Sequence, residues 1–190
     1  MKKYCCILFF FQSLLAVAQK DTLNKWRQSV SLDFSISGRN YGANIAPGFC
    51  LENNKNHFSL APLIMVSDNK SGFTFTGIKF NYAFYPGERQ KTVDFYFDYD
   101  FLFQRITVNE RFYELNSSTF KENVITYLEN YIGYGFKVRT LHHLYITHGV
   151  GIGYVFAHSK LYNSNDPYRG GYHEDSFSGI IKVGFEYYFH

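Results

Sequence analysis

Hydrophobic and polar residues alternate with a period of two along most of the chain after residue 25. Because successive side chains of a strand point to opposite faces, this pattern predicts β-strands with one apolar and one polar face. The last segment shows it clearly: Phe185, Tyr187 and Phe189 share an apolar, aromatic face, and Lys182 and Glu186 lie on the other. No segment carries a convincing helical stripe, so the pattern indicates an all-β protein.

Eight segments carry the alternation, and each has about the 9–11 residues that a tilted membrane-spanning strand needs. They are residues 26–37, 41–52, 58–66, 73–85, 93–104, 124–139, 144–156 and 176–190. The fourth changes phase, which predicts a β-bulge near Thr76-Gly77. Pro47 and Pro62 are awkward inside strands, because proline lacks the N–H of a ladder hydrogen bond and is usually found at edges or bulges.

The connectors between these segments differ in length in a regular way. Those at residues 53–56, 86–91 and 140–143 are short, whereas those at about 106–123 and 158–175 are long and polar, and both long ones fall on the same rim. Outer-membrane barrels have short periplasmic turns and longer external loops. The sequence therefore predicts a monomeric, eight-stranded antiparallel transmembrane up-and-down β-barrel in the outer membrane, with both termini periplasmic.

A soluble up-and-down barrel of the lipocalin type, with the apolar face inward around a ligand, is the main structural alternative. Two features argue against it. Aromatic residues make up 21% of the chain, more bulk than the interior of a small barrel holds. Glycines recur on the polar face, where a narrow lumen would need room for neighbouring long side chains. These glycines are Gly133, Gly135, Gly149, Gly151, Gly153 and Gly184.

Charged residues on the polar faces are predicted to form a network of ion pairs inside the lumen, because charges confined there are costly unless paired. The members are Arg27, Asp33, Glu52, Lys79, Asp94, Asp98, Asp100, Glu129, Lys137, Arg139, Lys182 and Glu186. The interior of an eight-stranded barrel is just wide enough for its own side chains. We therefore expect a filled lumen and no open diffusion pore.

The N-terminus has the pattern of a cleaved signal peptide at residues 1–18: a basic start, an apolar stretch and the cleavage site Ala16-Val17-Ala18. Residues 19–25 would form a short periplasmic segment and 26–190 the barrel. Cys5 and Cys6 would leave with the signal peptide, so Cys50 is expected to be a packed small residue without a disulfide partner. The mature net charge is near +1, which does not favour a nucleic-acid partner.

Candidate catalytic and metal-binding groups are weak. Asp98 and Asp100 are more simply network members than an acid pair, and adjacent His158 and Ser159 point to opposite faces of a strand, so they cannot form a relay by themselves. The glycines at 149, 151 and 153 lack the spacing of a dinucleotide-binding loop. His142, His143 and His173 lack the paired spacing of metal ligands, and residues 163–166, a candidate for calcium, lack the glycine and terminal glutamate of a calcium loop. We predict no catalytic residue, metal or cofactor; a lipid-modifying enzyme and a small channel stay as alternatives.

Three sequence features carry a resemblance to a known family: the Ala16-Val17-Ala18-Gln19 junction, Tyr127-Leu128-Glu129, and the segment Phe185–Phe189. With them the chain resembles the small outer-membrane β-barrel proteins of Gram-negative bacteria, in particular the barrel families common in Bacteroidetes. The resemblance implies that Phe185, Tyr187 and Phe189 act as the insertion signal read by the barrel-assembly machinery, although His190 follows the terminal aromatic residue. Outer-membrane lipid and that machinery are then the expected partners.

Any surface-interaction role would fall to the two long external loops, because aromatic residues and arginines exposed together are frequent contact residues. The loop residues in question are Arg111, Phe112, Tyr113, Tyr162, Tyr168, Arg169 and Tyr172. The sequence specifies no external ligand.

Overall fold

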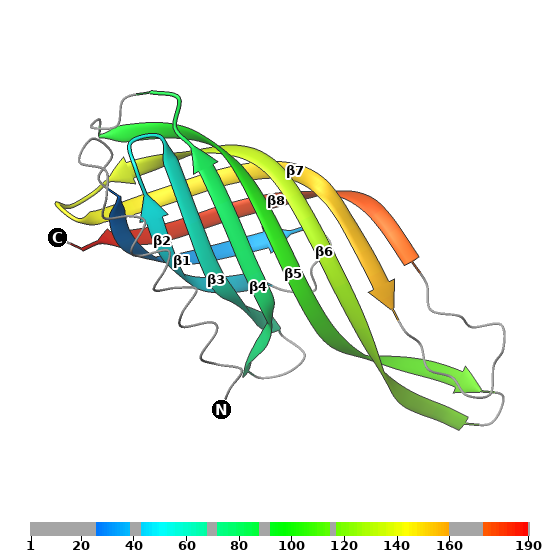
Figure 1. The fold of residues 1–190 in the computed structure, drawn as a ribbon. Coiled ribbons are helices and arrows are strands. Elements are labelled where there is room, and N and C mark those ends of the chain that lie inside the picture. The colour runs from blue at the N-terminus through cyan, green and yellow to red at the C-terminus, as the bar shows by residue number, and fades with distance from the viewer. Residues whose placement is uncertain are drawn as a thin grey trace, which may run out of the picture.

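The computed structural model describes residues 26–38, 43–67, 72–87, 92–114, 117–159 and 173–189. Within them, eight antiparallel strands follow one another around a closed barrel, and β1 pairs with β8 to close it (Figure 1). The strands are β1 Arg27–Ser37, β2 Ala43–Glu52, β3 Asn56–Ser67, β4 Gly72–Phe84, β5 Val93–Glu114, β6 Ser117–Arg139, β7 Leu144–Ser159 and β8 His173–Tyr188. The predicted fold class is confirmed. In the described ranges, no helix is long and apolar enough to cross a membrane.

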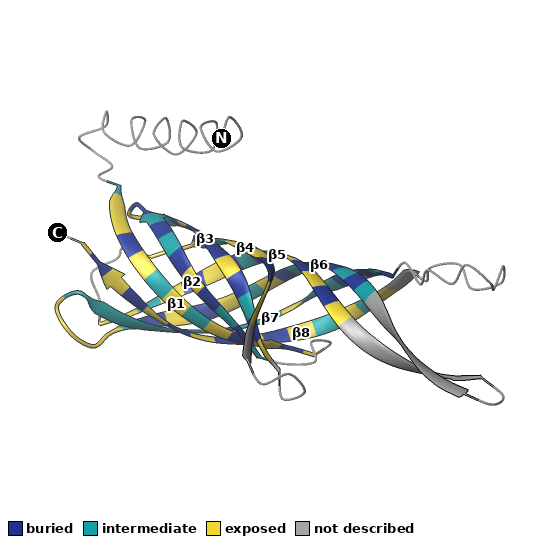
Figure 2. Ribbon diagram, turned by 90° about the horizontal axis from the view of Figure 1, so that it is seen from below, coloured by how far each residue is buried: buried dark blue, intermediate teal, exposed yellow. Residues whose placement is uncertain are grey.

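Burial is reversed relative to a water-soluble protein. Phe177 and Ile152 are 86% and 78% exposed on the outer wall, whereas Lys79 and Lys137 are 2% and 1% exposed inside. Figure 2 shows this as exposed and buried residues in alternation along the strands. The period-two pattern therefore places apolar side chains outside and charged ones in the lumen. The lipocalin-type alternative, which needs the apolar face inside, is wrong for this barrel.

The predicted bulge is present in β4. Leu63 pairs with Gly77, but the next residue of β3, Ile64, pairs with Phe75, so Thr76 is the extra residue. Its hydroxyl lies 3.4 Å from the carbonyl oxygen of Leu63, to which it donates. A Cβ at position 77 would lie 1.8 Å from the carbonyl oxygen of Phe103, so only glycine fits the adjoining position. The bulge lets apolar residues on both sides of it face outward despite their odd spacing.

Pro47 and Pro62 share one interruption of the sheet. The β2–β3 ladder is continuous up to Ile45 and Ile64 and resumes at Phe49 and Leu60, so the two prolines fall opposite each other in the gap. Each still has a partner on its other side, in β1 and β4. The barrel thus accommodates two residues that lack an N–H donor with a single local loss of pairing, away from any sheet edge.

The two rims differ, and we name them by their connections. At the turn rim, residues 53–55 join β2 to β3, residues 140–143 join β6 to β7, and the described chain ends at Phe189. At the hairpin rim, β5 and β6 remain paired as far as Glu114 and Ser117, although β4 pairs with β5 only to Gln104 and β7 with β6 only to Ile125. A two-stranded ribbon therefore extends beyond the barrel (Figure 1).

This ribbon corrects the expectation of a long loop at residues 106–123. The segment contains several β-branched and aromatic residues among its polar ones, and its two halves pair with each other by backbone hydrogen bonds. The connector between β7 and β8 also shortens to residues 160–172, which lie outside the described residues, with Tyr162, Tyr168, Arg169 and Tyr172. Arg111, Phe112 and Tyr113 belong to β5, but their side chains are not described. Residues 1–18 and 19–25 are also outside the described residues.

Candidate functional site in the barrel lumen

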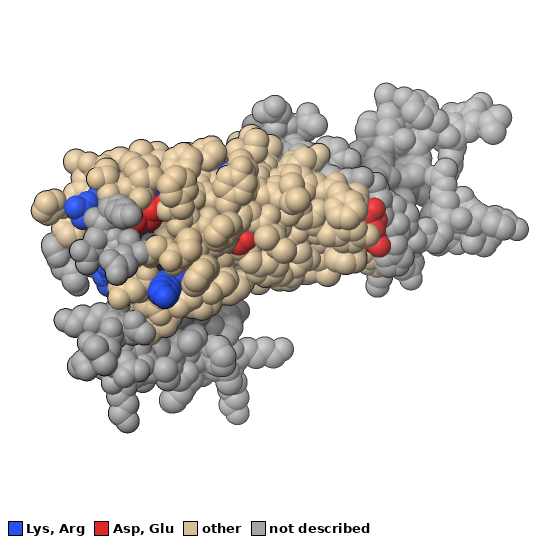
Figure 3. Space-filling view, turned by 90° about the horizontal axis from the view of Figure 1, so that it is seen from above, with Lys and Arg blue, Asp and Glu red and all other residues tan. Residues whose placement is uncertain are grey.

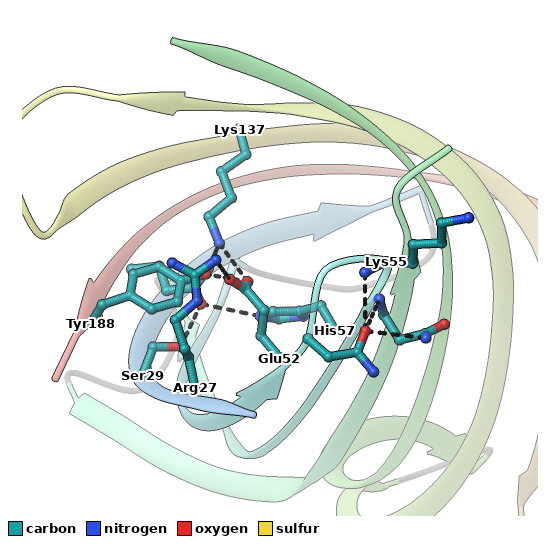
Figure 4. A network of polar contacts seen from close by, with 10 residues as sticks. Arg27, Ser29, Glu52, Lys55, His57, Lys137 and Tyr188 are labelled. Atoms are coloured by element: carbon teal, nitrogen blue, oxygen red, sulfur yellow. Dashed lines mark hydrogen bonds and ion pairs between the residues drawn. The ribbon is translucent and has the colours of Figure 1, made fainter. Parts of the chain in front are cut away.

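A first group of polar side chains fills the lumen at the turn rim, and we call it the lower network. It contains Arg27, Ser29, Glu52, His57, Lys137, Glu186 and Tyr188, and Figure 4 shows side chains of this group converging from opposite walls of the barrel. At its centre, the ammonium of Lys137 donates to Glu186 Oε2 at 2.6 Å, to Glu52 Oε2 at 3.2 Å and to the hydroxyl of Tyr188. Tyr188 in turn donates to Glu52.

The rest of the lower network surrounds Glu186. The hydroxyl of Ser29 donates to Glu186 Oε1, and His57 Nε2 lies 3.2 Å from the same oxygen. Arg27 Nη2 lies 3.6 Å from Glu52 Oε1, but the Arg27 side chain is 52% exposed. One buried ammonium therefore joins two buried carboxylates, and the guanidinium closes the group at the mouth of the barrel.

A second group, the middle network, lies deeper in the lumen and contains Asp33, Lys79, Asn81, Asp98, Asp100 and Lys182. Lys79 Nζ is 3.0 Å from Asp33 Oδ2 and 3.6 Å from Asp100 Oδ1. Lys182 donates to both Asp98 and Asp100. Lys79 of β4 joins Asp100 of β5 to Asp33 of β1, and Lys182 of β8 reaches both aspartates of β5. The network therefore connects strands that are not neighbours in the sheet.

Glycines on the lumen face provide the space for these side chains. A Cβ at Gly133 would lie 2.7 Å from Asp98 Oδ1, and one at Gly184 would lie 2.4 Å from Asp33 Oδ1. At Gly135 it would meet the ring of Tyr96 at 2.5 Å, whose hydroxyl donates to the carbonyl oxygen of His148 at 3.1 Å. The interpretation of the polar-face glycines as room for lumen side chains is confirmed at these positions.

Toward the hairpin rim the lumen becomes apolar. We call this cluster the upper plug; it consists of Ala46, Ala61, Leu63, Met65, Leu102, Ile106, Ile125, Tyr127, Tyr131, Val155, Ala157 and Ile180. Glu129 is buried beside it and accepts hydrogen bonds from Gln104 Nε2 at 3.0 Å and from the hydroxyl of Tyr131 at 2.6 Å. The sequence interpretation missed this plug. The polar faces of several strands become apolar near this rim, and this change in the sequence pattern could have indicated the plug.

The structure places the twelve predicted network residues in different surroundings. Nine of them fall within the two networks: Arg27, Asp33, Glu52, Lys79, Asp98, Asp100, Lys137, Lys182 and Glu186. Among the described residues, Glu129 has hydrogen bonds but no ion pair. Asp94 is half-buried and Arg139 exposed at the turn rim, and neither forms an ion pair within the described ranges.

His57 is the functional candidate that sequence reasoning missed. The predicted connector ends at residue 56 and the predicted strand begins at residue 58, so His57 belongs to neither of these predicted elements. In the structure β3 begins at Asn56, and His57 pairs with Glu52 and faces the lumen. The polar-face parity of β3, continued back by one step from Ser59, would have found it.

The lumen contains a cavity of about 40 Å³ between the lower and middle networks. Its lining includes His57, Lys79, Asp98, Lys182 and Glu186. A polar cavity of this size holds roughly two or three waters, because about 10–15 Å³ suffices for one. Its polar lining has room for solvent between the two groups of charges.

The side chains considered for the enzymatic alternatives show little of the geometry that catalysis needs. Ser159 is fully buried in the lumen wall and His158 is half-buried on the neighbouring, opposite-facing position, so the two do not form a relay. Asp98 and Asp100 are both held by Lys182. His142 and His143 lie in the turn between β6 and β7 with ring centroids 6.0 Å apart. The side chain of His173, and residues 163–166, are not described.

The chain matches no protein-family model and no curated protein. Among solved structures, it is similar to the N-terminal β-barrel domain of OprF from Pseudomonas aeruginosa, with a TM-score of 0.44 and 10% identity over 84% of this chain and 96% of that one. Neisserial surface protein A gives a TM-score of 0.40 and 12% identity over 86% and 96%. A major outer membrane protein from Thermus thermophilus gives 0.48 and 13% over 86% and 99%. The fold assignment rests on the strand register itself, and these likenesses add no functional argument.

Proposed function

We propose that this protein is an integral outer-membrane β-barrel whose lumen is filled by its own side chains, and that it has a structural or surface-interaction role. The reversed burial carries the proposal: large apolar residues are exposed around the wall, and lysines, aspartates and glutamates are buried inside. In Figure 3 the charged atoms on the visible face gather toward the two ends of the barrel, and the wall between them is nearly free of charge. Such a wall is suited to lipid.

The short turns support a periplasmic position for the turn rim, and its aromatic residues fit a membrane–water interface. Tyr187 packs against His143 and Phe189 with ring centroids 6.1 Å apart in each pair, and Trp26 lies 6.0 Å from Phe58. Aromatic side chains collect at membrane–water interfaces, and short turns face the periplasm in bacterial barrels. In this orientation both termini of the barrel chain are periplasmic, and Phe185, Tyr187 and Phe189 face outward, where assembly machinery could read them.

The filled lumen favours a structural role over conduction. The lower network joins β1, β2, β3, β6 and β8, the middle network joins β1, β4, β5 and β8, and the upper plug follows them. An ion would have to break buried charge pairs to pass, and breaking such a pair costs about 3–5 kcal/mol. The ribbon at the hairpin rim is the part offered to external partners, since it projects beyond the wall.

Two measurements test the proposal. Folded protein should stay with the outer-membrane fraction after a urea wash and migrate differently on gels before and after heating. In planar bilayers it should give no discrete conductance steps. Release of the folded protein into a detergent-free soluble fraction would refute the membrane location, and reproducible steps would refute the filled lumen. Removing residues 107–122 should leave the gel mobility shift intact, because among the described residues this ribbon pairs only with itself, and it should abolish any surface binding.

A further inference from the structure

Three potential metal ligands of different chemistry, two of them members of the lower network, lie close together. Cys50 of β2, His57 of β3 and Glu186 of β8 are all buried, and their ligand atoms all lie within 4.8 Å of one another. Cys50 and His57 project inward from neighbouring strands. Glu186 reaches them from across β1, where the short side chain of Ser29 leaves room and donates to Glu186 Oε1. His57 and Ser29 are shown in Figure 4.

The two oxygens of Glu186 have different partners. Oε2 accepts from Lys137 at 2.6 Å, whereas Oε1 accepts from Ser29 and faces His57 Nε2 at 3.2 Å. His57 Nδ1 is buried without a hydrogen-bond partner in the described part of the chain. The unpartnered nitrogen is not the one that faces Glu186, so a metal ion between Glu186 and His57 would be bound by Nε2. Cys50 is a free, fully buried thiol.

We propose that Cys50, His57 and Glu186 bind a single divalent transition-metal ion of the zinc type. A thiolate, an imidazole and a carboxylate are the ligands that Zn²⁺ takes, whereas Ca²⁺ and Mg²⁺ need oxygen ligands throughout. In a tetrahedral site with bonds of about 2.0–2.3 Å, ligand atoms lie roughly 3.3–3.8 Å apart. The 3.2 Å between His57 Nε2 and Glu186 Oε1 is already close to this range, and the Cys50 sulfur needs a shift of about 1 Å to reach it.

Charge and space at the site fit the same ion. Counting only the buried members, Glu52, Glu186 and Lys137 have a formal charge of −1, which binding of Zn²⁺ with release of the Cys50 proton to solvent neutralises; the half-exposed Arg27 pairs with Glu52 from outside this buried set. The 40 Å³ cavity touches both His57 and Glu186, so a water from it supplies the fourth ligand. Three protein ligands plus water is the arrangement of zinc sites that keep an open position.

The experiment uses the folded barrel in detergent, in a background in which His142 and His143 are both replaced by Ala to remove the two histidines of the turn. Zn²⁺ affinity is measured by competition with a chelating dye, and Co²⁺ is added as a spectroscopic probe. We expect one Zn²⁺ per chain and a near-ultraviolet thiolate-to-cobalt charge-transfer band. Cys50→Ser and His57→Ala should each weaken Zn²⁺ binding by more than about 100-fold, beyond the roughly 10–100-fold typical of losing an outer partner.

The matched control is Ser59→Ala, because Ser59 pairs with Cys50 in the sheet and faces the lumen without belonging to the ligand set. It should bind Zn²⁺ like the parent. Absence of Zn²⁺ binding in the parent, or unchanged affinity in Cys50→Ser, would overturn the proposal. If the ligand variants do not fold, the parent still decides: bound Co²⁺ without the charge-transfer band excludes Cys50 as a ligand. None of these outcomes depends on the membrane role proposed above.

Discussion

Replacing Lys182 by Met should destabilise the barrel strongly. Lys182 is 7% exposed and donates to Asp98 and Asp100, which lie two residues apart on β5 and face the same way. Without it, the remaining ammonium of the middle network is Lys79, 3.6 Å from Asp100 Oδ1 and already bonded to Asp33. Methionine has nearly the shape of the lysine stem, so the main loss is the charge and its hydrogen bonds.

The magnitude follows from burial. Removing one partner of a buried ion pair costs about 3–5 kcal/mol, because the other charge stays buried and uncompensated. The matched exposed pair is Arg27 with Glu52, whose arginine is 52% exposed, and Arg27→Ala should cost at most about 1 kcal/mol. With an m value of about 1–3 kcal/mol/M, a loss of about 4 kcal/mol lowers the urea midpoint by roughly 1.3–4 M. Reversible urea unfolding in lipid vesicles, followed by tryptophan fluorescence and gel mobility, measures it.

A double-mutant cycle separates lost attraction from general damage. In the Lys182→Met background, Asp98→Asn should restore about 1 kcal/mol or more, because it removes one uncompensated charge; in the parent it should destabilise, because it removes a partner of Lys182. The reversal of sign is the decisive result. A Lys182→Met variant within about 1 kcal/mol of the parent, or an Asp98→Asn effect of equal sign and size in both backgrounds, would refute this account of the lumen.

Two further predictions concern the wall. Gly184→Ala should lower the free energy of unfolding in urea by about 1–3 kcal/mol, because its Cβ would lie 2.4 Å from Asp33 Oδ1 and 2.7 Å from Thr147 Oγ1. The control Gly179→Ala, whose Cβ would have its nearest atom 3.6 Å away, should change it by no more than about 0.5 kcal/mol. Equal effects of the two variants would contradict the lumen crowding. Ile152→Arg, on the lipid side, should lose about 2–4 kcal/mol of stability in bilayers, and Leu141→Arg in the exposed turn should be neutral; a neutral Ile152→Arg would show that this surface meets water.

Period-two alternation predicted the strands and their two faces, because one residue of slip would exchange those faces completely. Phe97 and Asp98 show this: neighbours in sequence, one lies on the wall and the other in the middle network. The bulge was equally readable, since Phe75 and Ile78 could face the same side only with an extra residue between them.

Pairing partners across the lumen could not be read in the same way. Alternation predicts that Lys182 points inward, but the carboxylates that it meets depend on the strand tilt, which sets the height of every residue in the barrel. The end of the β5–β6 hairpin was also missed, because its polar residues resemble those of a loop and backbone pairing leaves no trace in hydropathy. Cys50 lay on a predicted strand, but its closeness to His57 and Glu186 needs the register of four strands.

The two ends of the lumen are stabilised by different forces, and this limits how a ligand could reach Cys50 and His57. Contact of the outer wall with lipid adds little hydrophobic stabilisation. In the upper plug, by contrast, Leu63, Leu102 and Ile125 are removed from water, which stabilises the folded barrel by about 25 cal/mol for each Å² of apolar surface buried. A hydrated ion crossing this plug would lose its water without a polar partner in return. At the turn rim, the half-exposed Arg27 covers the lower network and can swing aside at a cost below about 1 kcal/mol. A metal ion bound by Cys50, His57 and Glu186 would therefore enter from the turn rim, the side that we propose to be periplasmic.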